Sequence, residues 1–125
     1  MSVSAIRLGT AFATALAQND FDTIESLLAD DIDFRALTPR KFWEMHTAKE
    51  VVADVLQIWF DPDDHVDELV AVQVRPVANG RSHVSYRLRV TNADGPHLVE
   101  QQAYFDCGDE RITWMRVLCS GYLPV

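Results

Sequence analysis

The strongest structural signal in the chain is residues 66–90, VDELVAVQVRPVANGRSHVSYRLRV. Apolar and polar residues alternate on both sides of Asn79 and Gly80, and this period of two is typical of β-strands with one buried face. An Asn-Gly pair between two such runs favours the tight turn of a β-hairpin. We expect one buried face on each strand, formed by Val70, Val72 and Val74 on the first and by Val84, Tyr86, Leu88 and Val90 on the second.

Two further strands follow this hairpin toward the C-terminus. Turn-forming residues stand at 92–95 and at Gly108-Asp109, and the sequence alternates again after each of them. These turns predict strands over residues 98–105 and 112–120. The four strands together form an antiparallel meander.

The first half of the chain has helical periodicity instead. The second helix is expected to begin after Asp20, whose short side chain can cap a helix, and to end near Asp30. Residues 32–37 alternate as a strand does until Pro39 interrupts them. The first helix, before Asp20, has one apolar stripe, made of Leu8, Phe12, Ala15 and Leu16.

A capping box, Thr47-Ala48-Lys49-Glu50, begins the third helix after a loop that holds Phe42, Trp43 and His46. Asp61-Pro62 ends this helix. One full face of it is apolar, namely Ala48, Val51, Val52, Val55, Leu56, Trp59 and Phe60. Three helices, one early strand and a meander predict an α+β fold, in which three N-terminal helices pack on a curved antiparallel sheet.

Length and charge limit the possible functions. A chain of 125 residues with 48% apolar residues can bury the core of one domain, which we expect to span residues 1–125. The net charge of −8 repels phosphate groups, so nucleic acid and anionic membranes are poor partners. No segment approaches the ~18 consecutive apolar residues of a membrane span.

Compartment can be argued from the cysteines and from the first helix. Cys107 lies beside a turn and Cys119 lies well along the next strand, so at ~3.3 Å per residue their Cα atoms are over ~20 Å apart. A disulfide requires less than about 7 Å, and we therefore expect two free thiols. Arg7 and the apolar residues after it imitate a signal peptide, but Thr10 and Thr14 dilute the apolar run. A cytoplasmic protein is the expectation.

Three short motifs, in this order, resemble the nuclear transport factor 2-like superfamily, which includes SnoaL-like and ketosteroid-isomerase-like proteins. The motifs are Asn19-Asp20-Phe21 after the first helix, Leu28-Ala29-Asp30-Asp31 before a strand, and a closing hairpin from Tyr104-Phe105-Asp106 to Arg111-Ile112. The resemblance covers nearly the whole chain. It implies a cone-shaped pocket between the sheet and the third helix.

The catalytic residues of ketosteroid isomerases do not accompany this resemblance. Matching places Phe12 where that family has an oxyanion-holding Tyr, and Ala36 where it has its base Asp. The family's second acid corresponds to Gln101 or Gln102, depending on a one-residue gap. Such chemistry requires a carboxylate base and strong donors. We therefore predict that the protein does not isomerise a β,γ-unsaturated ketosteroid.

The same resemblance implies which strand residues face the pocket, although a register slip of one residue would reverse the faces. Tyr86 and Gln101 would then be the fixed polar points of a mainly apolar site. The alternative is that these two side chains bond to each other or to water beneath a filled core. The predicted ligand-binding residues are Phe12, Trp43, Phe60, Tyr86, Leu88, Gln101, Met115 and Cys119.

Other candidate groups have weaker support. His46 could act in acid–base catalysis at the pocket rim, but a surface histidine is commoner. Nothing near Cys119 in the sequence lowers a thiol pKa, so a buried apolar role is preferred there. Asp33 and Arg35 are interpreted as a structural ion pair. The acidic run 61–68 lacks the Gly and Glu that a calcium loop requires, so we expect no metal and no cofactor.

The opposite face of the sheet combines aromatic residues with arginine, which is typical of protein interfaces. Its members are Arg87, Arg89, Tyr104, Trp114, Arg116 and Leu118. An isolated domain does not normally expose Trp114 and Leu118 together. We expect a homodimer packed through this face.

These observations predict a protein that binds a small, mainly apolar organic molecule, with no particular reaction specified. One alternative is an isomerase, dehydratase or cyclase acting on a hydrophobic substrate, which would need a polar pair deep in the pocket. The other is a noncatalytic structural or association subunit whose pocket is filled by side chains. The volume of the pocket separates these hypotheses.

Overall fold

The computed structural model describes residues 3–125. Its N-terminal half contains α1 (Val3–Ala17), α2 (Phe21–Leu27), β1 (Leu28–Thr38), β2 (Lys41–Met45), α3 (Ala48–Val51), the π-helical segment η1 (Val52–Leu56) and α4 (Gln57–Trp59). Its C-terminal half contains β3 (His65–Pro76), the 3-10 turn η2 (Ala78–Gly80), β4 (Ser82–Asn92), β5 (Gly95–Cys107), β6 (Ile112–Cys119) and β7 (Leu123–Pro124).

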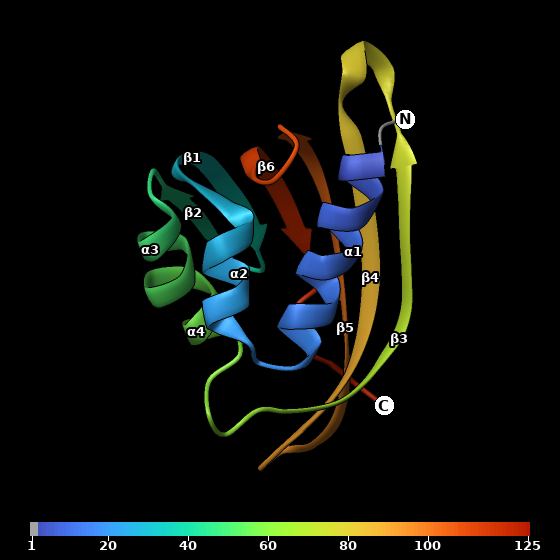
Figure 1. Ribbon diagram of the computed structural model, residues 1–125. Helices are drawn as coiled ribbons and strands as arrows, with labels where there is room; N and C mark the ends of the chain where they lie inside the picture. The colour runs from blue at the N-terminus through green and yellow to red at the C-terminus, as the bar shows by residue number, and fades with distance from the viewer. Residues whose placement is uncertain (1–2) are drawn as a thin grey trace.

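Seven strands form one sheet in the order β2-β1-β6-β5-β4-β3, with β7 paired to β5. The helices lie on one side of this sheet, and the sheet bends around them from β3 to β2 (Figure 1). The prediction of an α+β fold with a curved sheet is therefore confirmed. The sheet separates an inner face, under the helices, from an outer face.

Two details of the predicted architecture are wrong. The sheet is mixed rather than antiparallel, because β1 runs parallel to β6 while its other neighbour, β2, is antiparallel. The third helix also follows two strands where one was predicted, because residues 41–45 form β2 in place of the expected loop. A strand returning through long connections can lie parallel to its neighbour, and alternation along one strand does not reveal which neighbour it will have.

The predicted hairpin is present between β3 and β4. Asn79 and Gly80 have φ angles of 63° and 75°, as a type I′ turn requires. On β4 the four predicted residues are buried, but on β3 Val70 is exposed. The register of β3 shifts between Val66 and Glu68 and again between Leu69 and Ala71. These bulges turn Val70 outward and bend the strand, which a strict period of two does not anticipate.

Capping side chains define both shorter helices. Asp20 accepts a hydrogen bond from the Thr23 backbone N–H at the start of α2, as predicted. That helix ends at Leu27, three residues before the predicted position, because Leu28 already pairs with Ile112 as a strand residue. Of the two hydrogen bonds of the predicted capping box, the one from the Glu50 N–H to Thr47 Oγ1 is present, at 3.1 Å.

The helical run from 48 to 59 covers the inner face of β1 and completes the core. The apolar face predicted for it is buried in full, and the run contains a π-helical turn at Val52–Leu56. The predicted stripe of α1 is buried as well. At Gly9 this helix approaches the sheet so closely that an added Cβ would lie 2.9 Å from Val74 Cγ2.

The strand register decides which glutamine faces inward. Gln101 is buried on the inner face of β5, and its neighbour Gln102 is exposed on the outer face. The inward positions expected on β4, β5 and β6 are therefore those observed.

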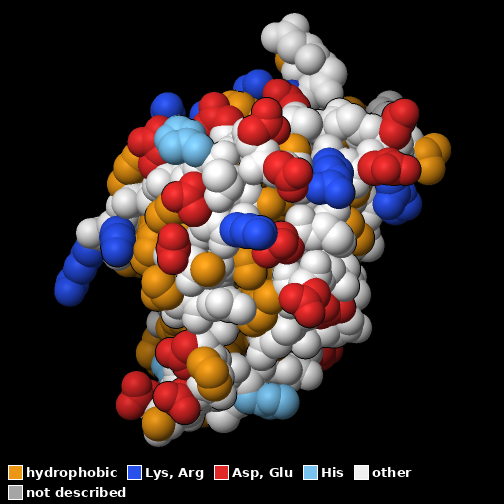
Figure 2. Space-filling model, turned by 60° about the vertical axis from the view of Figure 1, so that its left-hand side comes forward, with side chains coloured by type: hydrophobic (Ala, Val, Ile, Leu, Met, Phe, Trp, Pro, Cys, Tyr) orange, Lys and Arg blue, Asp and Glu red, His pale blue; other side chains and the backbone are white. Residues whose placement is uncertain are grey.

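Over the face shown in Figure 2, acidic side chains are scattered rather than gathered, with hydrophobic side chains between them.

Candidate functional site

The deep interior between helices and sheet is filled by side chains. Phe12, Leu88 and Met115 are at most 1% exposed and belong to the continuous core. The ring of Phe12 also packs on Tyr86, with a centroid separation of 6.3 Å. These side chains occupy the space that the resemblance assigned to a deep pocket. Ala36, at the position of the isomerase base, is buried there too.

Three inner-face side chains form a hydrogen-bonded chain at the edge of this core. The Tyr86 hydroxyl donates to Gln101 Oε1 at 2.5 Å, and Gln101 Nε2 donates to Cys119 Sγ at 3.2 Å. The backbone N–H of Gly121 donates to the same sulfur at 3.3 Å. Burial, with Cys119 as a second cause, raises the pKa of Tyr86. Tyr86 therefore remains a neutral donor at physiological pH.

A cleft of about 370 Å³ begins where this chain ends. Its walls come from five places in the sequence: the end of β1, the end of α4, the inner face of β5, the end of β6, and the C-terminal tail. The lining residues are Thr38, Pro39, Trp59, Phe60, Val99, Gln101, Cys119, Ser120, Gly121 and Tyr122. Most of this surface is apolar, with Gln101 and Cys119 as polar groups from the inner face of the sheet.

The C-terminal tail closes one side of the cleft. The Tyr122 hydroxyl donates to the backbone oxygen of Trp59, and its ring lies 6.3 Å from that of Phe60. Burial and the nearby Asp64 carboxylate raise the pKa of Tyr122. Beyond it, Leu123 pairs with Leu98 of β5, which fixes the tail to the sheet.

The predicted ligand-binding residues fall into three groups. Phe60, Gln101 and Cys119 line the cleft. Trp43 lies on β2 rather than in a loop, and its ring packs edge-on against Trp59 at 5.9 Å. The remaining four, Phe12, Tyr86, Leu88 and Met115, lie in the packed core and not in the wall of the cleft.

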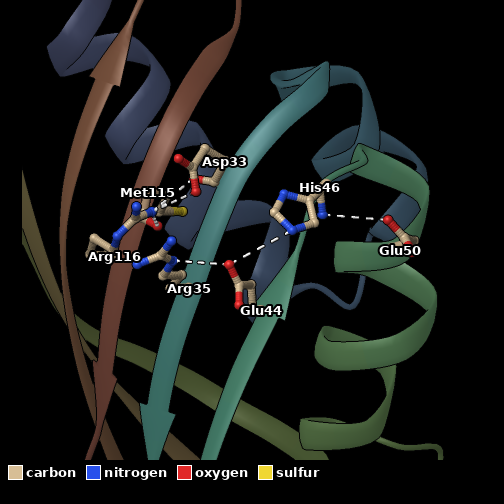
Figure 3. Close-up of polar contacts among 7 residues, drawn as sticks. All are labelled: Asp33, Arg35, Glu44, His46, Glu50, Met115 and Arg116. Atoms are coloured by element: carbon tan, nitrogen blue, oxygen red, sulfur yellow. Dashed lines mark hydrogen bonds and ion pairs between the residues drawn. The ribbon is translucent and has the colours of Figure 1, made fainter.

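His46 belongs to a polar network at the edge of the sheet instead of the cleft. Its Nε2 lies 3.7 Å from Glu44 Oε2, and its backbone N–H donates to Glu50 (Figure 3). The same Glu44 carboxylate pairs with Arg35 at 3.2 Å. The imidazole is largely exposed to solvent, so the surface interpretation fits its position.

Asp33 and Arg35 face outward as expected, but their ion-pair partners differ from the prediction. Asp33 pairs with Arg116 of β6 at 3.2 Å, while Arg35 pairs with Glu44 of β2. Figure 3 shows the two pairs on neighbouring strands. Residues i and i+2 of a strand lie ~7 Å apart, whereas cross-strand neighbours are closer, so lateral partners are favoured. The hydrogen bond from Arg116 lowers the pKa of Asp33.

The outer face of the sheet presents the aromatic and arginine residues predicted for it, together with two residues that sequence reasoning missed. Leu37, Phe42 and Leu118 are each about half exposed and are aligned across β1, β2 and β6. Beside them an open groove of about 820 Å³ crosses β3 to β6, over outward side chains that include Ser85 and Gln102. Phe42 was missed because its strand is short and follows directly after a turn.

Other predictions concern the acidic run, the cysteines and membranes. Asp61 and Asp64 are engaged in turn hydrogen bonds and a bond from Asn92. Cys107 and Cys119 are free thiols, as predicted. Among residues 3–125, no helix has the length and apolar character needed to cross a membrane.

Sequence reasoning also missed Trp59 and Tyr122 as cleft residues. Trp59 was assigned only to the apolar face of its helix, and Tyr122 was not assigned at all. The signal for both is an aromatic residue at the point where an element ends, Trp59 at the end of α4 and Tyr122 after Gly121. Aromatic side chains there can reach across the open end of a cone.

No family model and no curated protein matches this chain. Solved structures do. An LEH-like epoxide hydrolase from M. tuberculosis has a TM-score of 0.68 at 21% identity over 95% of this chain and 84% of its own. A proposed isomerase from Bacillus subtilis has a TM-score of 0.78 at 12% identity, over 94% of this chain and 86% of its own. A proposed polyketide cyclase from Xanthomonas campestris has a TM-score of 0.71 at 21% identity, over 92% of this chain and 89% of its own.

At these identities the likeness shows the fold alone. Such neighbours have the nuclear transport factor 2-like architecture that the sequence motifs resemble. The chain therefore has the nuclear transport factor 2-like fold.

Proposed function

We propose that the protein binds a small, mainly apolar organic molecule in the cleft at the end of α4. The observation that carries this proposal is a cleft of about 370 Å³ whose walls are aromatic and whose inner end holds the Gln101 amide. Small-molecule sites are usually concave and apolar with a few fixed polar groups. The Tyr86 hydroxyl fixes that amide from behind.

The residues that line the cleft favour binding of a ligand over catalysis of a reaction. Proton transfer needs a group that can gain and lose a proton near neutral pH. Within residues 3–125, the residues that line this cleft include no Asp, Glu, His, Lys or Arg, and the sulfur of Cys119 is occupied as an acceptor from the Gln101 amide and the Gly121 N–H. The tyrosine there has a raised pKa and its hydroxyl donates to a backbone oxygen.

Enzyme activity of the isomerase, dehydratase or cyclase kind remains the second hypothesis. It is supported by the printed names of structural neighbours, which include a hydrolase, proposed cyclases and a proposed isomerase. A third hypothesis, a noncatalytic association subunit, is supported by the filled deep interior and by the exposed row of Leu37, Phe42 and Leu118. A homodimer through that outer face, and a cytoplasmic location, belong to the proposal.

The binding proposal can be tested by thermal-shift screening with steroids, terpenoids and polyketide fragments. A ligand at ~100 times its dissociation constant adds about 2.7 kcal/mol of stability, which corresponds to a rise of roughly 10 °C in melting temperature. The rise should disappear in Cys119→Trp or the smaller Cys119→Met, which fill the cleft. It should persist in Cys107→Trp and Cys107→Met, since Cys107 lies at the other end of β5. Absence of any stabilising compound would contradict the proposal.

A further inference from the structure

Six outward side chains form one line across the outer face, and each strand from β2 to β3 in the order of the sheet contributes one of them. The backbone pairing joins the six, because each residue is the Cα partner of the next. From β2 to β3 the line reads Phe42, Leu37, Leu118, Gln102, Ser85 and Gln73. All six side chains are uncharged, so an uncharged strip crosses the whole width of the sheet.

The two halves of this line differ in character. Its first half is the apolar row, in which Phe42, Leu37 and Leu118 are 58%, 51% and 48% exposed. Its second half lies under the groove of about 820 Å³, whose lining includes the three polar residues of the line. One line therefore carries uncovered apolar side chains on one side of its midpoint and a groove on the other side.

Charged residues flank the line, and those of neighbouring strands neutralise one another. Four ion pairs of this kind have N–O distances of 2.9–3.2 Å. They are Arg35–Glu44, Arg116–Asp33, Arg87–Glu100 and Arg89–Glu68, and Figure 3 shows the first two. Each pair is neutral, so the middle of the outer face lacks the excess negative charge that the whole chain has, −8. Two chains of this charge repel each other, and contact through a neutral face adds the least repulsion.

This distribution matches the anatomy of a protein interface. Interfaces have a core with few charged residues and a polar rim, and here the uncharged line lies between the ion pairs. One polar group in the groove already has a partner, since Gln102 Oε1 lies 3.0 Å from His83 Nε2. Covering that amide oxygen with an apolar side chain costs less than covering an unbonded one.

The symmetry of a homodimer decides which parts of the line meet. The two halves are equally long, and the midpoint lies between Leu118 of β6 and Gln102 of β5. At ~4.8 Å between strands, Phe42 and Gln73 lie ~12 Å from this midpoint on opposite sides. A two-fold axis parallel to the strands reverses the line of the partner, so each apolar row lies over the partner's groove. An axis along the line would instead place the two apolar rows on each other and leave both grooves unfilled.

We propose that the homodimer uses the axis parallel to the strands, so that Phe42 and Leu37 of each copy fill the groove of the other. This arrangement removes both apolar rows from water and fills both grooves, which gives the close packing found at the core of stable interfaces. One chain holds both complementary parts, so a second copy is the partner that this face accommodates. The inference rests on the homodimer of the proposed function and specifies its geometry.

Cross-linking of single-cysteine variants with a short bis-maleimide tests this geometry. All variants also carry Cys107→Ser and Cys119→Ser, which remove the natural thiols. We expect a cross-linked dimer when Phe42→Cys and Gln73→Cys are mixed. Neither variant should cross-link alone, because each position lies ~24 Å from its own copy across the axis.

Two further positions serve as controls. Leu118→Cys, close to the midpoint, should cross-link alone about either axis, and Ile58→Cys, on α4 away from the outer face, should not. Cross-linking of Phe42→Cys alone would overturn the proposed axis and leave the dimer intact. Failure of the mixture, while Leu118→Cys cross-links, would do the same. A monomer by light scattering, with no cross-link at Leu118→Cys, would remove the dimer itself.

A second measurement keeps the natural cysteines. Gln73→Trp fills the groove and should raise the dissociation constant of the dimer about tenfold, whereas a dimer with its apolar rows packed on each other would be unaffected. An unchanged dissociation constant, measured by light scattering on dilution, would contradict a filled groove. Ligand binding in the cleft is tested separately by the thermal shifts, so its failure is distinguishable from each of these outcomes.

Discussion

At the residue scale, the decisive observation is that one buried polar chain, and not an acid–base pair, lies beside the cleft. The Tyr86 hydroxyl donates a hydrogen bond to Gln101, and the Gln101 amide donates one to Cys119. Each of the three residues comes from a different strand. A buried amide held by two neighbours has one orientation, and this orientation determines what the cleft offers to a ligand.

A double-mutant cycle measures how strongly this chain is coupled. Tyr86→Phe leaves Gln101 Oε1 without its donor, and Gln101→Leu leaves the Tyr86 hydroxyl without its acceptor. Each single change should lower the free energy of unfolding by about 1–3 kcal/mol, and the double variant should cost about 1 kcal/mol less than their sum. Urea unfolding provides the measurement, and simple additivity would show that the hydrogen bond contributes nothing.

The raised pKa of Tyr86 predicts how stability depends on alkaline pH. The folded state holds the phenolic proton more tightly than the unfolded state, so the contribution is complete below the ordinary tyrosine pKa of about 10. Above that pH the unfolded state releases its proton first, and the free energy of unfolding falls as the pH rises. Between about pH 8 and about pH 11 this loss should be smaller in Tyr86→Phe than in the wild type. An equal loss of unfolding free energy in both proteins would contradict this role of Tyr86.

At the element scale, local periodicity predicts what depends on neighbours in sequence, and tertiary contacts decide the rest. The Asn79-Gly80 turn, the Thr47 cap and the inward face of β4 were predictable because each depends on a few adjacent residues. The parallel pairing of β1 with β6 joins residues about 80 positions apart, such as Phe34 and Met115. No local pattern specifies such a partner.

The close packing of α1 on the sheet predicts an unusual effect at Gly9. Alanine is the better helix former by about 1 kcal/mol, but its Cβ would lie 2.9 Å from Val74 Cγ2 and 3.2 Å from the buried ring of Phe105. Gly9→Ala should therefore lower the free energy of unfolding by about 1–3 kcal/mol through overpacking.

The adjacent residue on the exposed side of the same helix provides the control for this effect. Thr10→Ala should change stability by at most about 0.5 kcal/mol, in the stabilising direction. If Gly9→Ala proved as favourable as Thr10→Ala in urea unfolding, the close approach of α1 to the sheet would be wrong.

At the scale of the whole molecule, residues 3–125 form a cleft at the end of α4, where we propose that a ligand binds, and an apolar row on the outer face of the sheet. The fold and the inward register were accessible from the sequence, because motif order and alternation determine them. The cleft itself was only partly accessible, since five separate segments form it and two of its aromatic residues, Trp59 and Tyr122, come from the ends of elements.

The outer face predicts a homodimer at micromolar concentration. Leu118→Glu places a charge at one end of the apolar row and should convert the dimer to a monomer, because an unpaired buried charge is costly at an interface. Ile58→Glu provides the control, since Ile58 is 56% exposed on α4, away from the outer face, and should leave the dimer intact. Light scattering distinguishes the two states. A monomeric wild-type protein would refute this assembly.

The most direct test of ligand binding uses the two thiols of the unaltered protein. Cys119 lines the cleft, whereas Cys107 lies at the opposite end of β5 and serves as an internal reference. The alkylation rate of each cysteine can be followed by mass spectrometry with and without a compound that raises the melting temperature. The account predicts that a saturating compound slows alkylation of Cys119 and leaves Cys107 unchanged. Equal rates at Cys119 with and without the compound would show that the molecule binds elsewhere.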